Sequence, residues 1–187
     1  MNISKHHLSR REALRLGAGT LLSLGWWPGA LRAADAGLGG RFAFVAVNDF
    51  HYIDDKAVPF LQRALALMKS GDSRPELCLM AGDFSEHATK EELSAPPELV
   101  KRLGFPTYGV VGNHDYQTQT DRQPYEEVFP DRINYSFVYR DWQIVCLDTT
   151  EGLRFSRTKV SDTTLRWIDD ALPKLDKKRP MIVVSHF

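Results

Sequence analysis

Residues 107–115 read Thr-Tyr-Gly-Val-Val-Gly-Asn-His-Asp, an apolar run that ends in a short polar string. We expect residues 107–111 to form a buried strand, because the run is short, apolar and rich in β-forming side chains. In a chain of this composition the string Gly112-Asn113-His114-Asp115 is expected by chance only about 0.0007 times. It is therefore the most informative short motif in the chain.

Other apolar runs end in the same way. Runs at 42–47, 77–81 and 181–185 each predict a buried strand, and turn-forming or polar residues follow each of them. The carboxyl ends of parallel strands meet at one edge of an open α/β sheet, and that edge is where sites form. The polar residues expected to gather there are Asp49 and His51, then Asp83, then Asn113, His114 and Asp115, and finally His186.

The segments between the strands indicate the fold class. Apolar residues at helical spacing predict helices over 59–70, 97–103 and 165–175, the second beginning at a proline because proline suits the first turn. Residues 134–140 and 142–147 predict a tight hairpin of two strands. Alternating strands and helices predict an α/β fold with a largely parallel sheet that is covered on both faces.

Composition excludes several classes of protein. The chain has 187 residues, with 24 Lys and Arg against 24 Asp and Glu, so its net charge is zero. This length suits about one domain, and the charge balance predicts no stable binding to nucleic acid. The 13 Gly, 10 Pro and 2 Cys, with 43% hydrophobic residues, exclude collagen-like, disordered and disulfide-scaffold proteins.

The first 36 residues differ in charge from the rest. They hold five cations and two anions, which leaves 19 cations against 22 anions, a net charge of −3, on residues 37–187. The basic start is followed by an apolar run at 16–27, too short to span a hydrocarbon core of ~30 Å, and by small residues at Ala34 and Ala36. This pattern predicts an export signal over residues 1–36 and a linker over 37–40.

Residues 9–15, Ser-Arg-Arg-Glu-Ala-Leu-Arg, resemble a twin-arginine (Tat) export signal, although Ala13 stands where a Phe is usual. Such signals are read by a receptor and are not anchors. We therefore expect the twin-arginine (Tat) export machinery as a partner, a periplasmic or extracellular location in a bacterium, and no transmembrane anchor. An uncleaved interfacial anchor and an ordinary amphipathic helix are the alternatives.

The two cysteines lie within apolar runs. Cys78 stands between two leucines and Cys146 between Val145 and Leu147. This placement predicts two buried thiols that pack as small apolar side chains. A disulfide is the alternative, because the predicted destination is oxidising.

Taken in order, the polar motifs resemble those of the calcineurin-like metallophosphoesterase family. Its hallmarks are Asp-x-His, Gly-Asp, Gly-Asn-His-Asp/Glu, a later His after a strand, and Gly-His-x-His. The first four stand here as Asp49-Phe50-His51, Gly82-Asp83, Gly112-Asn113-His114-Asp115 and Val184-Ser185-His186. The resemblance covers residues 41–187 and implies a sandwich of two sheets flanked by helices. The Gly-His-x-His element is absent, so we expect an incomplete domain, present only in its N-terminal part, from a C-terminally truncated gene product.

The resemblance implies a dinuclear, metal-dependent hydrolase that cleaves phosphomonoesters or phosphodiesters by attack of a metal-bridging hydroxide. The substrate is then a small phosphate ester. Oxygen and imidazole ligands suit Mn, Fe, Zn or Co. By resemblance, Asp83 bridges the two ions, Asp49 and His51 complete the ligands of one, and Asn113 and His186 belong to the other.

The same resemblance suggests roles for residues beside these ligands. His114 is the expected general acid that protonates the leaving alkoxide, with Asp115 fixing its tautomer and raising its pKa. In purple acid phosphatases a Tyr three residues after the bridging Asp ligates iron; here that residue is Glu86, so iron–tyrosinate chemistry is not expected. Glu86 is left with a role beside the ligands, or with a plain surface or hydrogen-bonding role, while His87 and Tyr116 lie near enough in sequence to touch substrate.

Two other interpretations stay open. One is an exported, non-catalytic metal- or phosphate-binding protein, which the missing last motif favours for this chain. The other is an exported structural α/β domain without metal. Residues 135–149 resemble cyclic-nucleotide phosphodiesterase-like and acid-phosphatase-like branches of the family, a weak analogy that does not separate monoesters from diesters.

Overall fold

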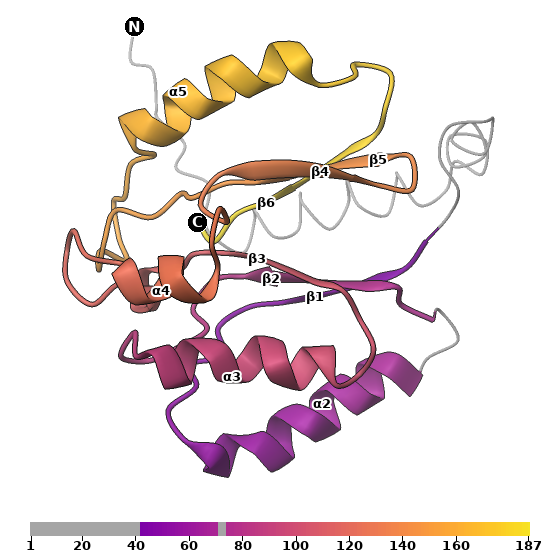
Figure 1. The fold of residues 1–187 in the computed structure, drawn as a ribbon, viewed down its shortest axis with the longest axis vertical. Helices are drawn as coiled ribbons and strands as arrows, with labels where there is room; N and C mark the ends of the chain where they lie inside the picture. The colour runs from indigo at the N-terminus through magenta and orange to yellow at the C-terminus, as the bar shows by residue number, and fades with distance from the viewer. Residues whose placement is uncertain (1–41, 71–73) are drawn as a thin grey trace, which may run out of the picture. The chain divides into compact units, whose positions relative to one another are not determined.

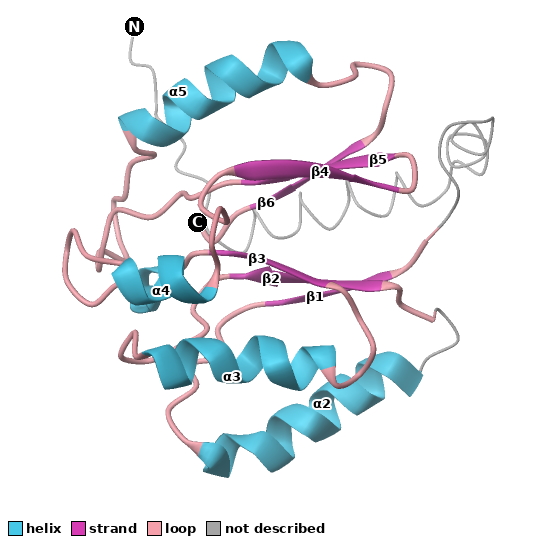
Figure 2. Cartoon of the chain, in the orientation of Figure 1, coloured by secondary structure: helices cyan, strands magenta, loops and turns pink. Residues whose placement is uncertain are grey.

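The fold is a sandwich of two three-stranded sheets with helices on its outer faces (Figures 1 and 2). A computed structural model describes residues 42–70 and 74–187. The predicted export signal and linker lie outside these residues. Among the described residues, no helix combines the length and the apolar character needed to cross a membrane. The two-sheet α/β architecture expected from the sequence is confirmed.

The first sheet is parallel and its connections are helical. Its strands are β1 (Phe44–Val47), β2 (Leu77–Ala81) and β3 (Thr107–Val110), in the order β1-β2-β3. The connecting helices α2 (Val58–Ser70) and α3 (Lys90–Lys101) both cover the face of this sheet that points away from the second sheet (Figure 1). All three carboxyl ends therefore lie at one edge, as the strand–helix alternation predicted.

The second sheet contains the predicted hairpin. Strands β4 (Tyr135–Tyr139) and β5 (Trp142–Cys146) are antiparallel, and β6 (Met181–Val184) pairs in parallel with β5. Helix α5 (Asp162–Ala171) covers the outer face of this sheet (Figure 2), and the short helix α4 (Gln123–Val128) lies between β3 and β4 in the chain. Because β6 runs parallel to β5, its carboxyl end carries His186 away from the hairpin turn.

Two helices depart from the predicted boundaries. Helix α3 begins two turns earlier than predicted, because Thr89 caps it by accepting a hydrogen bond from the Glu92 amide (3.2 Å). Pro96 and Pro97 therefore lie inside the helix, where the prediction had placed a proline in the first turn. Helix α5 likewise begins three residues earlier than predicted, behind its cap Ser161. Helix α4 was not predicted, because six residues are too few to show helical periodicity.

Strand β2 is buried on both faces and divides the core into two layers. Cys78 and Met80 face the helices, whereas Leu77 and Leu79 face the second sheet. This alternation follows from the two-residue period of a strand. The helix-side layer includes Leu61 and Leu65 of α2 with Leu93, Leu99 and Val100 of α3. The layer between the sheets includes Val110, Ile144, Cys146 and Val184.

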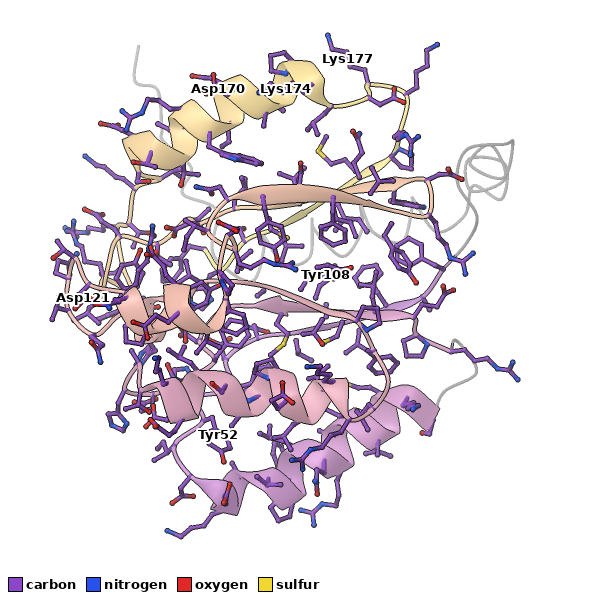
Figure 3. All side chains as sticks on the ribbon, viewed as in Figure 1. Tyr52, Tyr108, Asp121, Asp170, Lys174 and Lys177 are labelled. Atoms are coloured by element: carbon purple, nitrogen blue, oxygen red, sulfur yellow. The ribbon has the colours of Figure 1, made fainter. Side chains whose placement is uncertain are left out.

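Aromatic side chains of β3 and β4 join the two sheets. Tyr108 lies between the sheets (Figure 3), with its ring stacked on Phe137 at a centroid distance of 3.9 Å. The hydroxyl of Tyr135 donates to the carbonyl of Gly109 at 2.7 Å. Apolar contact and this hydrogen bond together set how the second sheet lies on the first.

A buried carboxylate joins the loops that follow β2 and β3. Oδ1 of Asp115 accepts hydrogen bonds from the amides of Phe84 (2.9 Å) and Ser85 (3.1 Å), and Oδ2 accepts from the Gly112 amide (2.8 Å). Asp115 is fully buried. Burial raises the pKa of its carboxyl group to about 7, whereas these amide donors favour the ionised form. Asp115 therefore holds two strand ends in a fixed position relative to each other.

Both cysteines should be unreactive in the folded protein. They are free, fully buried thiols in different core layers, and burial raises the pKa of Cys78 to about 12 and that of Cys146 to about 11. Since the thiolate is the reactive form, we expect labelling by an aromatic disulfide reagent at neutral pH to be at least about 100-fold slower than in urea. In urea without reductant, both thiols should react with the reagent. If neither thiol reacts under these conditions, the two cysteines form a disulfide instead.

Replacing Asp115 by Asn should destabilise the fold. The amide group of Asn turns one of the two acceptor oxygens into a donor that faces backbone N–H groups. We expect a loss of about 1–3 kcal/mol in the free energy of unfolding, measured by urea denaturation. The matched control is Asp141→Asn in the exposed β4–β5 turn, which should leave the midpoint unchanged. Equal midpoints for the two variants would contradict the role given to Asp115.

Candidate metal centre

The carboxyl ends of four strands meet at one place in the fold. Two sets of side chains there, each with ligand atoms within 4.8 Å of one another, could hold a metal ion: His51, Asp83 and His114, and Asp49, Asp83 and His186. Asn113 joins them, because its Oδ1 lies 3.2 Å from Nε2 of His186. The structure thus brings together all five predicted ligands and His114. The sequence predicted that Asp49 and His51 bind the same ion. In the structure Oδ1 of Asp49 lies 3.7 Å from Nε2 of His51.

Asp83 is common to both sets. Its Oδ2 lies 3.5 Å from Nε2 of His51 and 3.4 Å from Nε2 of His186, while its Oδ1 accepts a hydrogen bond from the His114 amide at 2.9 Å. Burial alone would raise the pKa of Asp83, but the hydrogen bonds from His186 and the His114 amide outweigh it and lower the pKa. An ionised carboxylate therefore lies between two imidazole nitrogens.

His186 reaches this carboxylate from the second sheet. Its Nδ1 lies 2.8 Å from the carbonyl oxygen of Ala81, which can only accept, so Nδ1 carries a hydrogen. Burial lowers the pKa of His186, but hydrogen bonds to Asp83 and Ala81 raise it above its ordinary value. Nε2 is the nitrogen that faces Asp83, and a metal ion that binds there must displace any proton it carries.

His51 has the same arrangement on the other side of Asp83. Its Nδ1 lies 2.6 Å from Oε2 of Glu86, and its Nε2 points to Asp49 and Asp83. A carboxylate behind the ring favours a hydrogen on Nδ1, which leaves the lone pair of Nε2 for a cation. Glu86 therefore lies beside a predicted ligand, the first of the two roles that the sequence left open for it.

Close approach and backbone strain both mark this edge. A Cβ atom on Gly82 would lie 2.7 Å from Nδ1 of His186, and one on Gly112 would lie 2.1 Å from Oδ1 of Asp83. Asp49, His51 and Asp83 have φ angles of 53°, 42° and 53°, in the left-handed region that few non-glycine residues occupy. Such strain persists where the surrounding structure imposes it, and it is concentrated at functional sites.

His114 lies at the rim of the site, with 37% of its side chain exposed. Its ring meets that of His51 at a centroid distance of 4.5 Å, and its Nδ1 lies 3.4 Å from the Glu86 carbonyl oxygen. The prediction that Asp115 orients this ring is wrong. The tight turn Asn113–Asp115 sends the Asp115 carboxylate into the protein, where backbone amides and the Ser85 hydroxyl occupy it.

His87 and Tyr116 make their side-chain hydrogen bonds with residues other than the predicted ligands. The Tyr116 hydroxyl accepts from Arg122 at 2.7 Å and from Thr150 at 3.2 Å, next to a pocket of about 830 Å³. His87 is exposed, and its Nδ1 lies 3.0 Å from Oε1 of Glu92. Both residues therefore flank the site, and neither belongs to its donor set.

The sequence did not predict two polar interactions near the site, one made by Arg122 and one made by Glu92. Arg122 pairs with the buried Asp148 beside Tyr116, a contact that no sequence pattern announces because the two residues are far apart in the chain. Glu92 is buried and accepts from the amides of Glu86 and His87. The string Thr89-Lys90-Glu91-Glu92 has capping-box spacing, and that signal would have placed both this glutamate and the start of α3.

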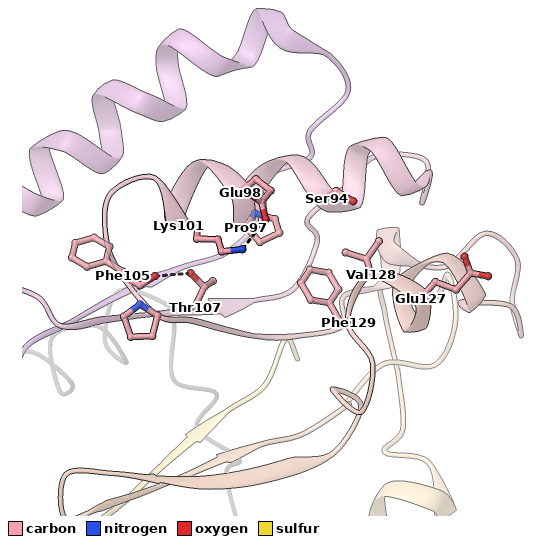
Figure 4. Close-up of a pocket in the computed structure, with 10 residues that line it drawn as sticks. Ser94, Pro97, Glu98, Lys101, Phe105, Thr107, Glu127, Val128 and Phe129 are labelled. Atoms are coloured by element: carbon pink, nitrogen blue, oxygen red, sulfur yellow. Dashed lines mark hydrogen bonds and ion pairs between the residues drawn. The ribbon is translucent and has the colours of Figure 1, made fainter.

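A second pocket lies elsewhere. It has a volume of about 540 Å³ and is lined by residues of α3, the start of β3 and the end of α4, with Phe105 and Phe129 among them (Figure 4). None of the predicted site residues lines it. It is therefore separate from the candidate metal centre.

The donor set fits metal binding. It contains carboxylate, amide and imidazole donors in a partly buried cluster, without a thiolate. Such donors suit zinc and first-row transition metals. Two partly buried contacts, of His186 with the Ala81 carbonyl and of His51 with Glu86, are of the kind that orient metal-binding imidazoles. The residues that would hold the ions are Asp49, His51, Asp83, Asn113 and His186.

Known proteins resemble the chain in sequence. A probable glycerophosphodiester phosphodiesterase of Arcobacter nitrofigilis is 28% identical over 116 residues, which are 60% of this chain and 42% of that protein. A probable cyclic nucleotide phosphodiesterase of Synechococcus is 25% identical, over 81% of this chain and 60% of that protein. A 3',5'-cyclic-nucleotide phosphodiesterase of Nostoc is 28% identical, over 75% of this chain and 54% of that protein. The chain thus spans about half the length of these relatives.

Comparison of structures gives the same fold. A purple acid phosphatase from yellow lupin (Lupinus luteus) seeds superposes with a TM-score of 0.55 at 12% identity, over 79% of this chain and 31% of that chain. At this identity the similarity concerns the fold alone. The family model described as calcineurin-like phosphoesterase matches residues 42–187, which include every residue of the candidate metal centre. The chain belongs to the calcineurin-like phosphoesterase family.

Proposed function

We propose that this chain carries the metal-binding part of a phosphoesterase that hydrolyses small phosphate esters, and phosphodiesters in preference to monoesters. One observation carries the proposal. The buried Asp83 carboxylate lies within 3.5 Å of an imidazole nitrogen on each side, and each of those rings has its other nitrogen engaged. The preference for diesters rests on the three relatives, whose names are those of phosphodiesterases.

The five candidate ligands would bind two metal ions. Asp49 and His51 would hold one ion, Asn113 and His186 the other, and the Asp83 carboxylate would serve both. When bound, two such ions supply Lewis-acid chemistry that lowers the pKa of water and neutralises charge on a phosphate. Asn113 contributes a neutral oxygen, so its side preserves more positive charge than a second carboxylate would.

His114 would deliver the proton. Its backbone amide is held by Asp83 and its ring lies at the exposed rim, so one ring nitrogen is free to approach a substrate above the ions. Donation from this ring to the leaving alkoxide would complete cleavage of the phosphorus–oxygen bond. General acid catalysis of this kind contributes about 10²–10⁴-fold in rate.

Metal content and turnover test the proposal together. We expect the purified chain to bind Mn²⁺ or Zn²⁺, to hydrolyse a bis-aryl phosphodiester faster than the aryl monoester, and to lose both activities with chelator. The control is Asp83→Asn, which should lose metal and activity, because it removes the charge that both ions share. Bound metal without turnover of either ester would instead indicate a non-catalytic metal-binding protein. Absence of both metal and turnover would indicate a structural domain.

Replacing His114 by Ala separates catalysis from metal binding. A general acid that is not a ligand should cost about 10²–10⁴-fold in kcat when removed, while the metal content stays at the wild-type value. The exposed His87 provides the matched control, and His87→Ala should change neither quantity. A parallel loss of bound metal in His114→Ala would show that this ring is a ligand.

A further inference from the structure

We propose that Glu86 is a positioning residue that orients both His51 and His114, and that the buried Glu92 holds the loop that carries it. For its consequences on metal binding, this inference rests on the proposed function. It assigns a role to two carboxylates that belong to neither set of candidate ligands.

The Glu86 side chain lies behind the His51 ring. Its Oε2 is 2.6 Å from Nδ1 of His51, the nitrogen opposite the one that points to Asp83. An acceptor at this position fixes both the orientation of the ring and the location of its hydrogen. Nε2 of His51 is then left as the atom that a metal ion would meet.

Glu86 also lies against the second histidine. Its carbonyl oxygen is 3.4 Å and its Oε2 is 3.7 Å from Nδ1 of His114. The rings of His51 and His114 contact each other edge to face, at a centroid distance of 4.5 Å. One residue therefore faces both a predicted ligand and the predicted acid, through its side chain and its backbone.

The loop that carries Glu86 is held by buried carboxylates along its whole length. Its four consecutive amides, residues 84–87, all donate to carboxylates: the first two to Asp115, and the last two to Oε2 of Glu92 at 3.1 and 2.7 Å. Glu92 is 7% exposed and lies in the first turn of α3, where the helix dipole favours a negative charge. The position of Glu86 thus depends on the start of α3.

Metal affinity gives the first test. We expect Glu86→Ala to weaken the binding of Mn²⁺ to the purified chain, measured by calorimetry, about 10–100-fold. Glu86→Gln keeps an acceptor for the His51 hydrogen and should recover most of that affinity. Wild-type affinity in Glu86→Ala would overturn the inference. Equal losses in the Gln and Ala variants would also overturn it, because Glu86 would then act as a direct ligand.

The role of Glu92 in holding the loop is tested by the same measurement of metal affinity. Glu92→Ala should weaken metal binding in the same direction as Glu86→Ala, because the loop loses two of its four hydrogen bonds to carboxylates. The matched control is Glu91→Ala, which removes an exposed carboxylate from the same first turn of α3. It should change the affinity less than twofold. If Glu92→Ala does not fold, Glu92→Gln, which keeps one acceptor oxygen for the loop amides, should bind metal as the wild type does.

A readout without metal separates this inference from the proposed function. In ¹⁵N NMR spectra of the metal-free chain at about pH 8, above the ordinary pKa of histidine, the His51 hydrogen should reside on Nδ1 in the wild type and in Glu86→Gln. It should redistribute toward Nε2 in Glu86→Ala. An unchanged pattern would overturn the positioning role even if metal binds. If the wild type binds no metal but Glu86→Ala still shows this redistribution, only the proposed function is refuted.

Discussion

The loops after β2 and β3 are joined by reciprocal hydrogen bonds, in which a carboxylate of each loop accepts from amides of the other. The site depends on these bonds. Asp115, on the β3 side, accepts hydrogen bonds from amides on the β2 side, while Asp83, on the β2 side, accepts one from the His114 amide on the β3 side. Amides at the end of a parallel sheet have no further strand to bond, and leaving them buried without partners would cost free energy. The same bonds that satisfy these amides also place Asp83 at the centre of the donor set.

The fold and the clustering of the candidate ligands were predictable because both depend on local signals. Short apolar runs mark the buried strands, and polar residues directly after them must share an edge once the strands are parallel. Asp115 could not be placed in this way, since sequence position does not tell on which side of a tight turn a side chain emerges. The capping-box spacing of Thr89 and Glu92 marks the start of α3, but it does not reveal that the Glu92 carboxylate satisfies amides of the preceding loop, because that contact depends on packing.

The second sheet contributes one residue that the first sheet cannot supply. His186 follows β6 and hydrogen-bonds to the Ala81 carbonyl at the end of β2, across the sandwich. The absence of a side chain on Gly82 allows this approach, because a Cβ there would overlap the imidazole. Packing between the sheets, including the stacked rings of Tyr108 and Phe137, therefore determines where the His186 imidazole lies relative to the strand ends of the first sheet.

Asp49 and His186 come from nearly opposite ends of the described chain, yet both face Asp83. Ligands so far apart in sequence have no common position in an unfolded chain, so a metal ion would bind the native state almost exclusively. Mass action then links occupancy to folding: a free ion at 100 times its dissociation constant adds about 2.7 kcal/mol to the stability of the native state. The metal supply of the compartment in which this protein folds would therefore set how much of the folded protein persists.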